Sequence, residues 1–140
     1  MVFLYPFLGK IKFSDFIGSN TGQVPPGSNI LNATLRVYYS NPSGDPQNVY
    51  QVNENWTETN VSWNGFSTPG FPQTGSLVTT FVPQGGTISY INITSVVQNW
   101  VNGATNFGIL INSTSADGAA YDSSESSTVN NRPKLTVTYS

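Results

Sequence analysis

The chain has 140 residues, of which only 9% are charged, and its formal net charge at pH 7 is −2. Nucleic-acid binding depends on many Lys and Arg side chains at phosphates, so five basic residues exclude a nucleic-acid partner. No apolar run approaches the roughly 20 residues of a transmembrane helix, so no membrane span is expected. An aromatic content of 13% supplies the apolar area for a single folded domain.

Histidine and cysteine are absent. Their absence excludes Ser-His-Asp and Cys-His centres and removes the commonest metal ligands, so we expect no catalytic residues, no metal and no cofactor. Asp117, Asp122 and Glu125 cluster in a Gly- and Ser-rich stretch. Their spacing lacks the dense repeat of a calcium loop, which favours solvated turn residues. Glu54 and Glu58 are expected at a strand edge, where nothing marks a glycosidase cleft.

The N-terminal segment, residues 1–13, begins with a strongly apolar stretch. Two placements would bury it. It forms the first strand of its own sandwich, with Pro6 at an edge or bend, or it adds to the sheet of a neighbouring copy. The second placement builds a head-to-tail homopolymer. In either case, the segment is followed by a single sandwich domain over residues 14–140. The residues predicted to make that assembly contact are Val2, Phe3, Leu4, Tyr5, Phe7 and Leu8.

Period-two alternation of apolar and polar residues recurs along the rest of the chain. Strands are predicted at residues 11–13, 33–39, 49–52, 77–82, 87–93, 108–112 and 135–139, with another ending near Trp63. In residues 33–39, Leu35 and Val37 face one side, while Arg36 and Tyr38 face the other. Many short strands separated by Gly, Pro, Asn and Ser predict an all-β antiparallel sandwich or barrel, with enough strands for two packed sheets.

One short helix is expected at residues 95–101. Thr94 is the predicted N-cap, and Gly103 is the predicted left-handed stop just past the end. The apolar stripe of this helix consists of Val96, Val97, Trp100 and Val101.

Three stretches together resemble the DNRLRE-domain family. They are the strand Ala33-Thr34-Leu35-Arg36-Val37-Tyr38, the W-x-E-x-x-V-x-W run from Trp56 to Trp63, and the run from Ile91 to Trp100 followed by Gly103, Asn106 and Gly108. The resemblance implies a jelly-roll module of secreted and cell-surface proteins, associated in some members with polysaccharides. Asn92 stands where members often carry Asp, and Ser123-Ser124-Glu125 keeps only the Glu of the usual Ser-Arg-Glu.

Aromatic residues are the candidate ligand contacts. Trp56, Trp63 and Trp100 have faces that suit sugar rings, but core packing is the favoured interpretation for each of them. Tyr38 lies opposite the apolar face of its strand and Tyr121 lies in a polar loop. These two tyrosines are the predicted ligand-binding residues, with incidental exposure as the alternative.

Five Asn-x-Ser/Thr sequons occur, at Asn32, Asn55, Asn60, Asn92 and Asn112. Their number is no greater than the composition gives by chance. The alternation points each Asn away from its apolar neighbours, and this accessibility is the reason to expect glycosylation.

These observations lead to a non-catalytic extracellular or cell-surface protein whose leader sequence is not within this chain. The first hypothesis is a glycosylated structural or adhesive subunit that assembles into a filament by strand addition. The alternatives are a carbohydrate-binding module that contacts polysaccharide and a virion surface protein. The expected partners are further copies of this chain and glycans.

Overall fold

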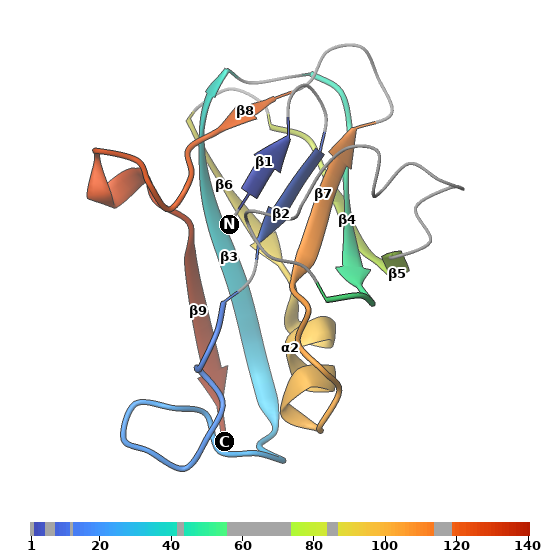
Figure 1. Ribbon diagram of the computed structural model, residues 1–140, viewed down its shortest axis with the longest axis vertical. Helices are drawn as coiled ribbons and strands as arrows, with labels where there is room; N and C mark the ends of the chain where they lie inside the picture. The colour runs from blue at the N-terminus through green and yellow to red at the C-terminus, as the bar shows by residue number, and fades with distance from the viewer. Residues whose placement is uncertain are drawn as a thin grey trace.

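The computed structural model describes residues 2–4, 8–11, 13–41, 44–55, 74–83, 87–113 and 119–140. Two antiparallel sheets pack face to face, and one short helix lies at an end of the sandwich (Figure 1). One sheet has five strands in the order β1-β2-β7-β4-β5, and the other has four, with β3 between β6 on one side and β8 and β9 on the other. The predicted all-β sandwich with a short helix is confirmed.

Most predicted strands are found with ends shifted by a few residues. The five-stranded sheet contains β1 (Val2–Leu4), β2 (Leu8–Ile11), β4 (Gln47–Val52), β5 (Thr74–Phe81) and β7 (Ile109–Ser113). The four-stranded sheet contains β3 (Ile30–Asn41), β6 (Ile88–Asn92), β8 (Ala120–Tyr121) and β9 (Lys134–Tyr139). The helix is α2 (Thr94–Val101), and a 3-10 turn, η1 (Val129–Asn131), precedes β9. The predicted strand near Trp63 lies outside the described residues.

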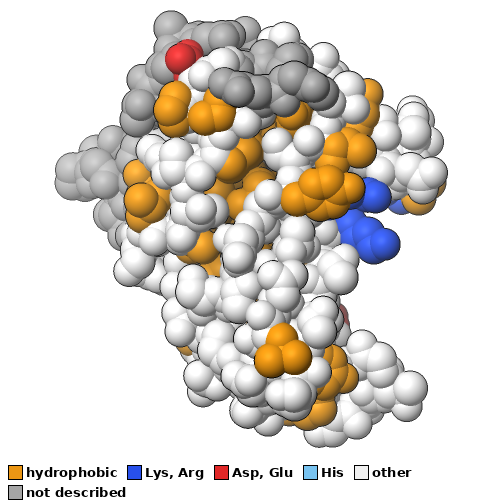
Figure 2. Space-filling view, turned by 180° about the vertical axis from the view of Figure 1, so that it is seen from behind, with side chains coloured by type: hydrophobic (Ala, Val, Ile, Leu, Met, Phe, Trp, Pro, Cys, Tyr) orange, Lys and Arg blue, Asp and Glu red, His pale blue; other side chains and the backbone are white. Residues whose placement is uncertain are grey.

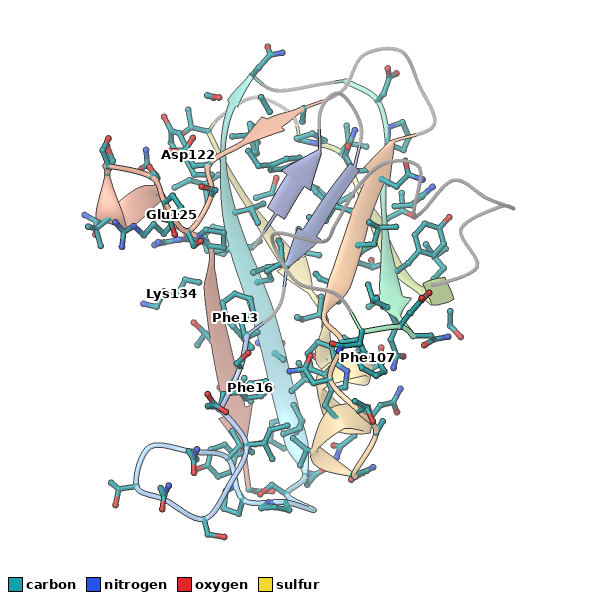
Figure 3. All side chains as sticks on the ribbon, in the orientation of Figure 1. Phe13, Phe16, Phe107, Asp122, Glu125 and Lys134 are labelled. Atoms are coloured by element: carbon teal, nitrogen blue, oxygen red, sulfur yellow. The ribbon has the colours of Figure 1, made fainter. Side chains whose placement is uncertain are left out.

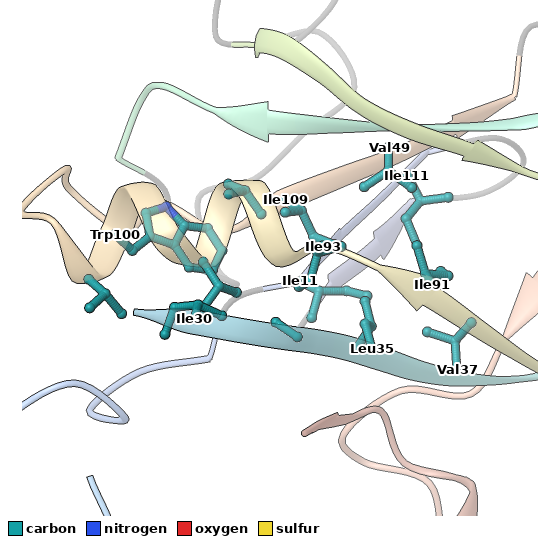
Figure 4. Packing of buried hydrophobic residues seen from close by; sticks show 14 of the residues in the cluster. Ile11, Ile30, Leu35, Val37, Val49, Ile91, Ile93, Trp100, Ile109 and Ile111 are labelled. Atoms are coloured by element: carbon teal, nitrogen blue, oxygen red, sulfur yellow. The ribbon is translucent and has the colours of Figure 1, made fainter. Parts of the chain in front are cut away.

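The core lies between the two sheets. Ala33, Leu35 and Val37 on β3 face inward and are fully buried, as the alternation predicts. They face Ile109 and Ile111 of the opposite sheet, with Ile91 and Ile93 beside them (Figure 4). Burying one such aliphatic side chain contributes about 1.5–3 kcal/mol, so this layer holds the two sheets together.

Helix α2 closes one end of that core. Its four predicted stripe residues are all buried. Trp100 is only 4% exposed and its ring meets Phe16 edge to face, with centroids 6.3 Å apart, which confirms its predicted role in core packing. Gly103 has φ +108 and its N–H donates to the carbonyl of Trp100, as expected of a left-handed helix stop.

The predicted N-cap was wrong. Ile93 occupies the cap position and Thr94 is the first helical residue. The Thr94 hydroxyl instead accepts a hydrogen bond from the Ala33 N–H at 2.9 Å, which ties the helix to β3. Asn92 Oδ1 accepts bonds from the Thr94 N–H at 3.0 Å and from the Thr94 hydroxyl at 2.7 Å. A contact to β3 therefore replaces the usual cap.

The N-terminal strands belong to the five-stranded sheet of their own chain. β1 pairs with β2, and β2 pairs antiparallel with β7 from Leu8↔Asn112 to Ile11↔Ile109. Tyr5 and Phe7 lie outside the described residues. Strand donation to a neighbour receives no support from this pairing and stays a prediction.

Candidate functional site

The outer face of the four-stranded sheet carries an unusual set of side chains. Antiparallel register fixes which residues lie opposite one another on this face. Across β3 and β6 the pairs are Tyr38↔Ile88, Arg36↔Tyr90 and Thr34↔Asn92, and across β3 and β9 Arg36 also lies opposite Lys134. Facing pairs of this kind have Cβ atoms roughly 4.5–5.5 Å apart. We call Tyr38, Arg36, Ile88, Tyr90 and Lys134 the outer patch.

The outer patch leaves large apolar groups in water. Tyr90 is 70% exposed and Ile88 is 43% exposed, while Tyr38 and Arg36 are half-buried. Figure 2 views the molecule from behind and shows hydrophobic side chains beside the blue Lys and Arg side chains. An exposed aromatic side chain on a sheet, with a cation opposite it on the neighbouring strand, is a surface that a ligand can cover.

Positive charge gathers around this face. Three of the five basic residues, Arg36, Arg132 and Lys134, belong to it or to the loop that borders it. Arg36 Nη2 donates to the Asn130 carbonyl at 2.7 Å, and Arg132 Nε donates to the Ser126 carbonyl at 3.0 Å. These bonds fix both guanidinium groups and leave further N–H donors for a ligand.

Of the two acidic residues near this loop, Asp122 has a partner for its carboxylate and Glu125 is held through its backbone N–H. Asp122 Oδ2 accepts a hydrogen bond from the Ser126 hydroxyl at 2.9 Å, and the Glu125 N–H donates to the Ser123 hydroxyl at 3.0 Å. Figure 3 labels Asp122, Glu125 and Lys134 along this border. Asp117 lies outside the described residues. Within the described ranges, no three Asp or Glu residues come together as a metal site.

An open pocket of about 550 Å³ adjoins the start of α2. It is lined by Ile30, Val78, Thr79, Asn92, Thr94, Ser95 and Gln98. The side chain of Gln98 is already hydrogen-bonded within the chain. Its Oε1 accepts from the Ile30 N–H at 2.8 Å, and its Nε2 donates to the Ser28 carbonyl at 3.0 Å. None of its described lining residues is charged, and amides and hydroxyls form part of its wall.

A second pocket, of about 410 Å³, lies beside the inner face of β9. Its lining includes Phe13, Phe16, Leu135, Val137 and Tyr139. Figure 3 shows Phe13 and Phe16 in this region, and Tyr139 at the rim is 42% exposed. Among the residues that the structure describes, this groove is lined by aromatic, aliphatic and small polar side chains and by no charged one, so it is the alternative place for a sugar ring.

The two tyrosines predicted to bind ligand have different positions. Tyr38 belongs to the outer patch. Tyr121 does not lie in a polar loop as expected, because it belongs to β8 and packs edge to face on Tyr39, with centroids 6.3 Å apart, and its role in ligand binding stays a prediction. Burial raises the pKa of the Tyr121 phenol, and the nearby Tyr39 adds to that rise. Sequence reasoning missed Tyr90, although its alternation with Ile91 was a usable signal.

The sequons also differ in accessibility. Asn32, Asn55 and Asn92 are exposed, and Asn60 lies outside the described residues. Asn112 is only 7% exposed, so the expectation that it points to solvent was wrong. The reason is that β7 is a central strand with β2 and β4 on its two sides.

Other expectations concern residues that the structure leaves undescribed. Trp56, Trp63 and Glu58 are among them, so their predicted core and edge positions stay predictions. In the described part of the chain, no helix has the length and apolar character needed to cross a membrane.

One comparison identifies a family. The model of carbohydrate-binding module family 96 matches residues 11–139, which include every strand from β3 to β9. No curated protein sequence matches the chain. The match supports the link to carbohydrate that the motifs imply, whereas the assignment to the DNRLRE-domain family stays a prediction.

Proposed function

The chain belongs to carbohydrate-binding module family 96, and on that premise we propose that it binds a polysaccharide chain through the outer patch. The observation that carries the proposal is the register of Arg36 opposite the exposed ring of Tyr90. It places an apolar platform and a multidentate hydrogen-bond donor side by side on a rigid sheet.

Each residue of the patch has a defined part in this proposal. The Tyr90 ring covers the C–H face of a sugar ring, and Tyr38 and Ile88 extend the apolar surface along the strands. Arg36 and Lys134 donate to hydroxyl or carboxylate oxygens at the ring edge. Outward residues repeat about every 7 Å along a strand, so the patch offers successive positions to a linear chain of sugars.

The test is affinity electrophoresis of the unmodified chain through gels that contain neutral or uronic-acid polysaccharides. We expect Tyr90→Ala to abolish the retardation that the wild type shows. Tyr50→Ala, in the five-stranded sheet, is the matched control and is expected to migrate like the wild type. Loss of retardation in Tyr139→Ala instead of Tyr90→Ala would move the site to the groove beside β9.

We also propose that the protein is a non-catalytic binder located outside the cell. The match to a binding-module family supports this, as does the lack of His and Cys in the sequence. Incubation with the retained polysaccharide should release no new reducing ends. A steady rise in reducing ends would contradict a purely binding role.

The structural hypotheses have no specific observation in their favour. A filament built by strand donation rests on the apolar composition of residues 1–9 and on the low charge of the chain, and a virion surface protein rests on composition. Carbohydrate binding is preferred because both the family match and the outer patch support it.

A further inference from the structure

Two of the described sequon asparagines, Asn32 and Asn92, differ in their hydrogen bonds. Asn32 Nδ2 donates to the Thr34 hydroxyl at 2.8 Å, so its amide nitrogen is engaged. In Asn92 the side-chain oxygen is engaged instead, because Oδ1 accepts hydrogen bonds from the N–H and from the hydroxyl of Thr94. The Asn92 Nδ2 has no hydrogen bond to the described part of the chain, and the residue is exposed.

The surroundings of Asn92 have room for an attached sugar. Asn92 lines the uncharged pocket of about 550 Å³ beside α2, with Ser95 and Thr79 in the same wall. A first sugar on Nδ2 would find hydroxyl groups to bond there and no charge to desolvate.

Asn92 also lies on the same face as the proposed binding surface. It is two residues beyond Tyr90 on β6, so both side chains lie on the outer face of the sheet. In the register with β3, Asn92 pairs with Thr34 and Tyr90 pairs with Arg36. The Cα atoms of Asn92 and Tyr90 are therefore about 7 Å apart. A branched glycan on Asn92 is much larger than this separation, so it reaches over the Tyr90 ring.

We propose that Asn92 is an N-glycosylation site and that its glycan covers Tyr90, so that modification and polysaccharide binding exclude each other. That the glycan covers Tyr90 is inferred from the position of Asn92. Only the mutual exclusion of glycosylation and polysaccharide binding rests on the proposed function. In the transfer, the Asn92 Nδ2 loses one proton and forms a bond to C1 of the first sugar. The lipid diphosphate that carried the oligosaccharide leaves with the electron pair of the broken C1–O bond.

The experiment compares the full chain secreted from a host that has N-linked oligosaccharyltransferase with the chain made in a host without it. Glycopeptide mass spectrometry should place a glycan on Asn92. Hydroxyl-radical footprinting should then show at least a threefold lower oxidation of Tyr90 in the modified form. Tyr139 is the internal control and should react equally in both forms. An unmodified Asn92, or unchanged oxidation of Tyr90, would overturn the proposal.

Binding is measured on the same samples. The modified chain should lose retardation in polysaccharide gels, and Asn92→Gln secreted from the same host should regain it, whereas Asn55→Gln should not. Equal retardation of modified and unmodified chains would overturn the exclusion. If the unmodified chain binds no polysaccharide, the proposed function fails, while occupancy and footprinting still decide whether the Asn92 glycan covers Tyr90.

Discussion

Arg36 on β3 lies opposite Tyr90 on β6, and the same Arg36 lies opposite Lys134 on β9. Arg36, on the central strand, therefore lies between the exposed ring of Tyr90 and a second cation, and the three residues form a row across three strands. The Asn130 carbonyl holds the guanidinium in place, so the donors are oriented before a ligand arrives. This relationship is the basis of the binding surface.

The charge on this face predicts selectivity between polysaccharides. Lys134→Ala should weaken binding to a uronic-acid polymer about three- to tenfold, which corresponds to roughly 1 kcal/mol for an exposed charge. Binding to a neutral polymer should change little. Lys10→Ala, in the other sheet, is the matched control. The same loss with neutral and acidic polymers, measured by isothermal titration calorimetry, would show that Lys134 does not act through charge.

Ionic strength should separate the contribution of charge to binding from the contribution of stacking on Tyr90. Raising the ionic strength from 0.05 to 0.5 M screens exposed charges, because the Debye length falls well below about 10 Å. Affinity for an acidic polymer should fall, while stacking on Tyr90 should persist. Salt-independent binding of the acidic polymer would contradict a role for Arg36 and Lys134.

The contact between α2 and β3 is expected to stabilise the fold. Thr94→Val removes the acceptor of the Ala33 N–H while keeping the volume, and should lower the free energy of unfolding by about 1–3 kcal/mol. Thr94→Ser keeps the hydroxyl and should lose less. Urea unfolding of unglycosylated protein measures both, and equal losses in the two variants would assign the effect to packing.

Tyr121 predicts a loss of stability in alkali. Burial raises the pKa of Tyr121 above its ordinary value of 10.0, so the folded chain keeps a proton that the unfolded chain releases. The resulting stability is fully present below pH 10 and is lost as the pH rises above it. The free energy of unfolding of the wild type should therefore fall more steeply above pH 10 than that of Tyr121→Phe. Parallel pH profiles would contradict this account.

The N-terminal hairpin predicts the result of a truncation. Removal of residues 1–9 takes away β1 and half of β2, and leaves part of one edge of β7 unpaired. The melting temperature should drop by several degrees, and the truncated chain should tend to associate through the exposed edge. Filaments formed by the full chain and lost on truncation, seen in the electron microscope, would instead establish strand donation.

Local patterns were sufficient for the elements whose side chains alternate clearly. Leu35, Val37 and Arg36 gave the two faces of β3 correctly, and the stripe around Trp100 gave the helix. Each of these signals lies within a few consecutive residues, where strand or helix geometry alone fixes which side is buried.

The errors concern residues whose environment depends on distant partners. Thr94 looked like an ordinary cap because its bond to Ala33 spans 61 positions. Asn112 looked exposed because the sequence does not show that β7 is central in its sheet. The Arg36–Tyr90 pair was missed for the same reason, since strand register is set by the whole fold.

The most direct test of the central claim is an NMR titration of the unglycosylated chain with oligosaccharides cut from the polysaccharide that retards it. The largest amide shifts are predicted at residues 34–38 and 88–90, on the two strands that carry Arg36 and Tyr90. Shifts confined to residues 13–24 and 135–139 would place the ligand in the groove beside β9 and contradict the outer patch as the binding surface.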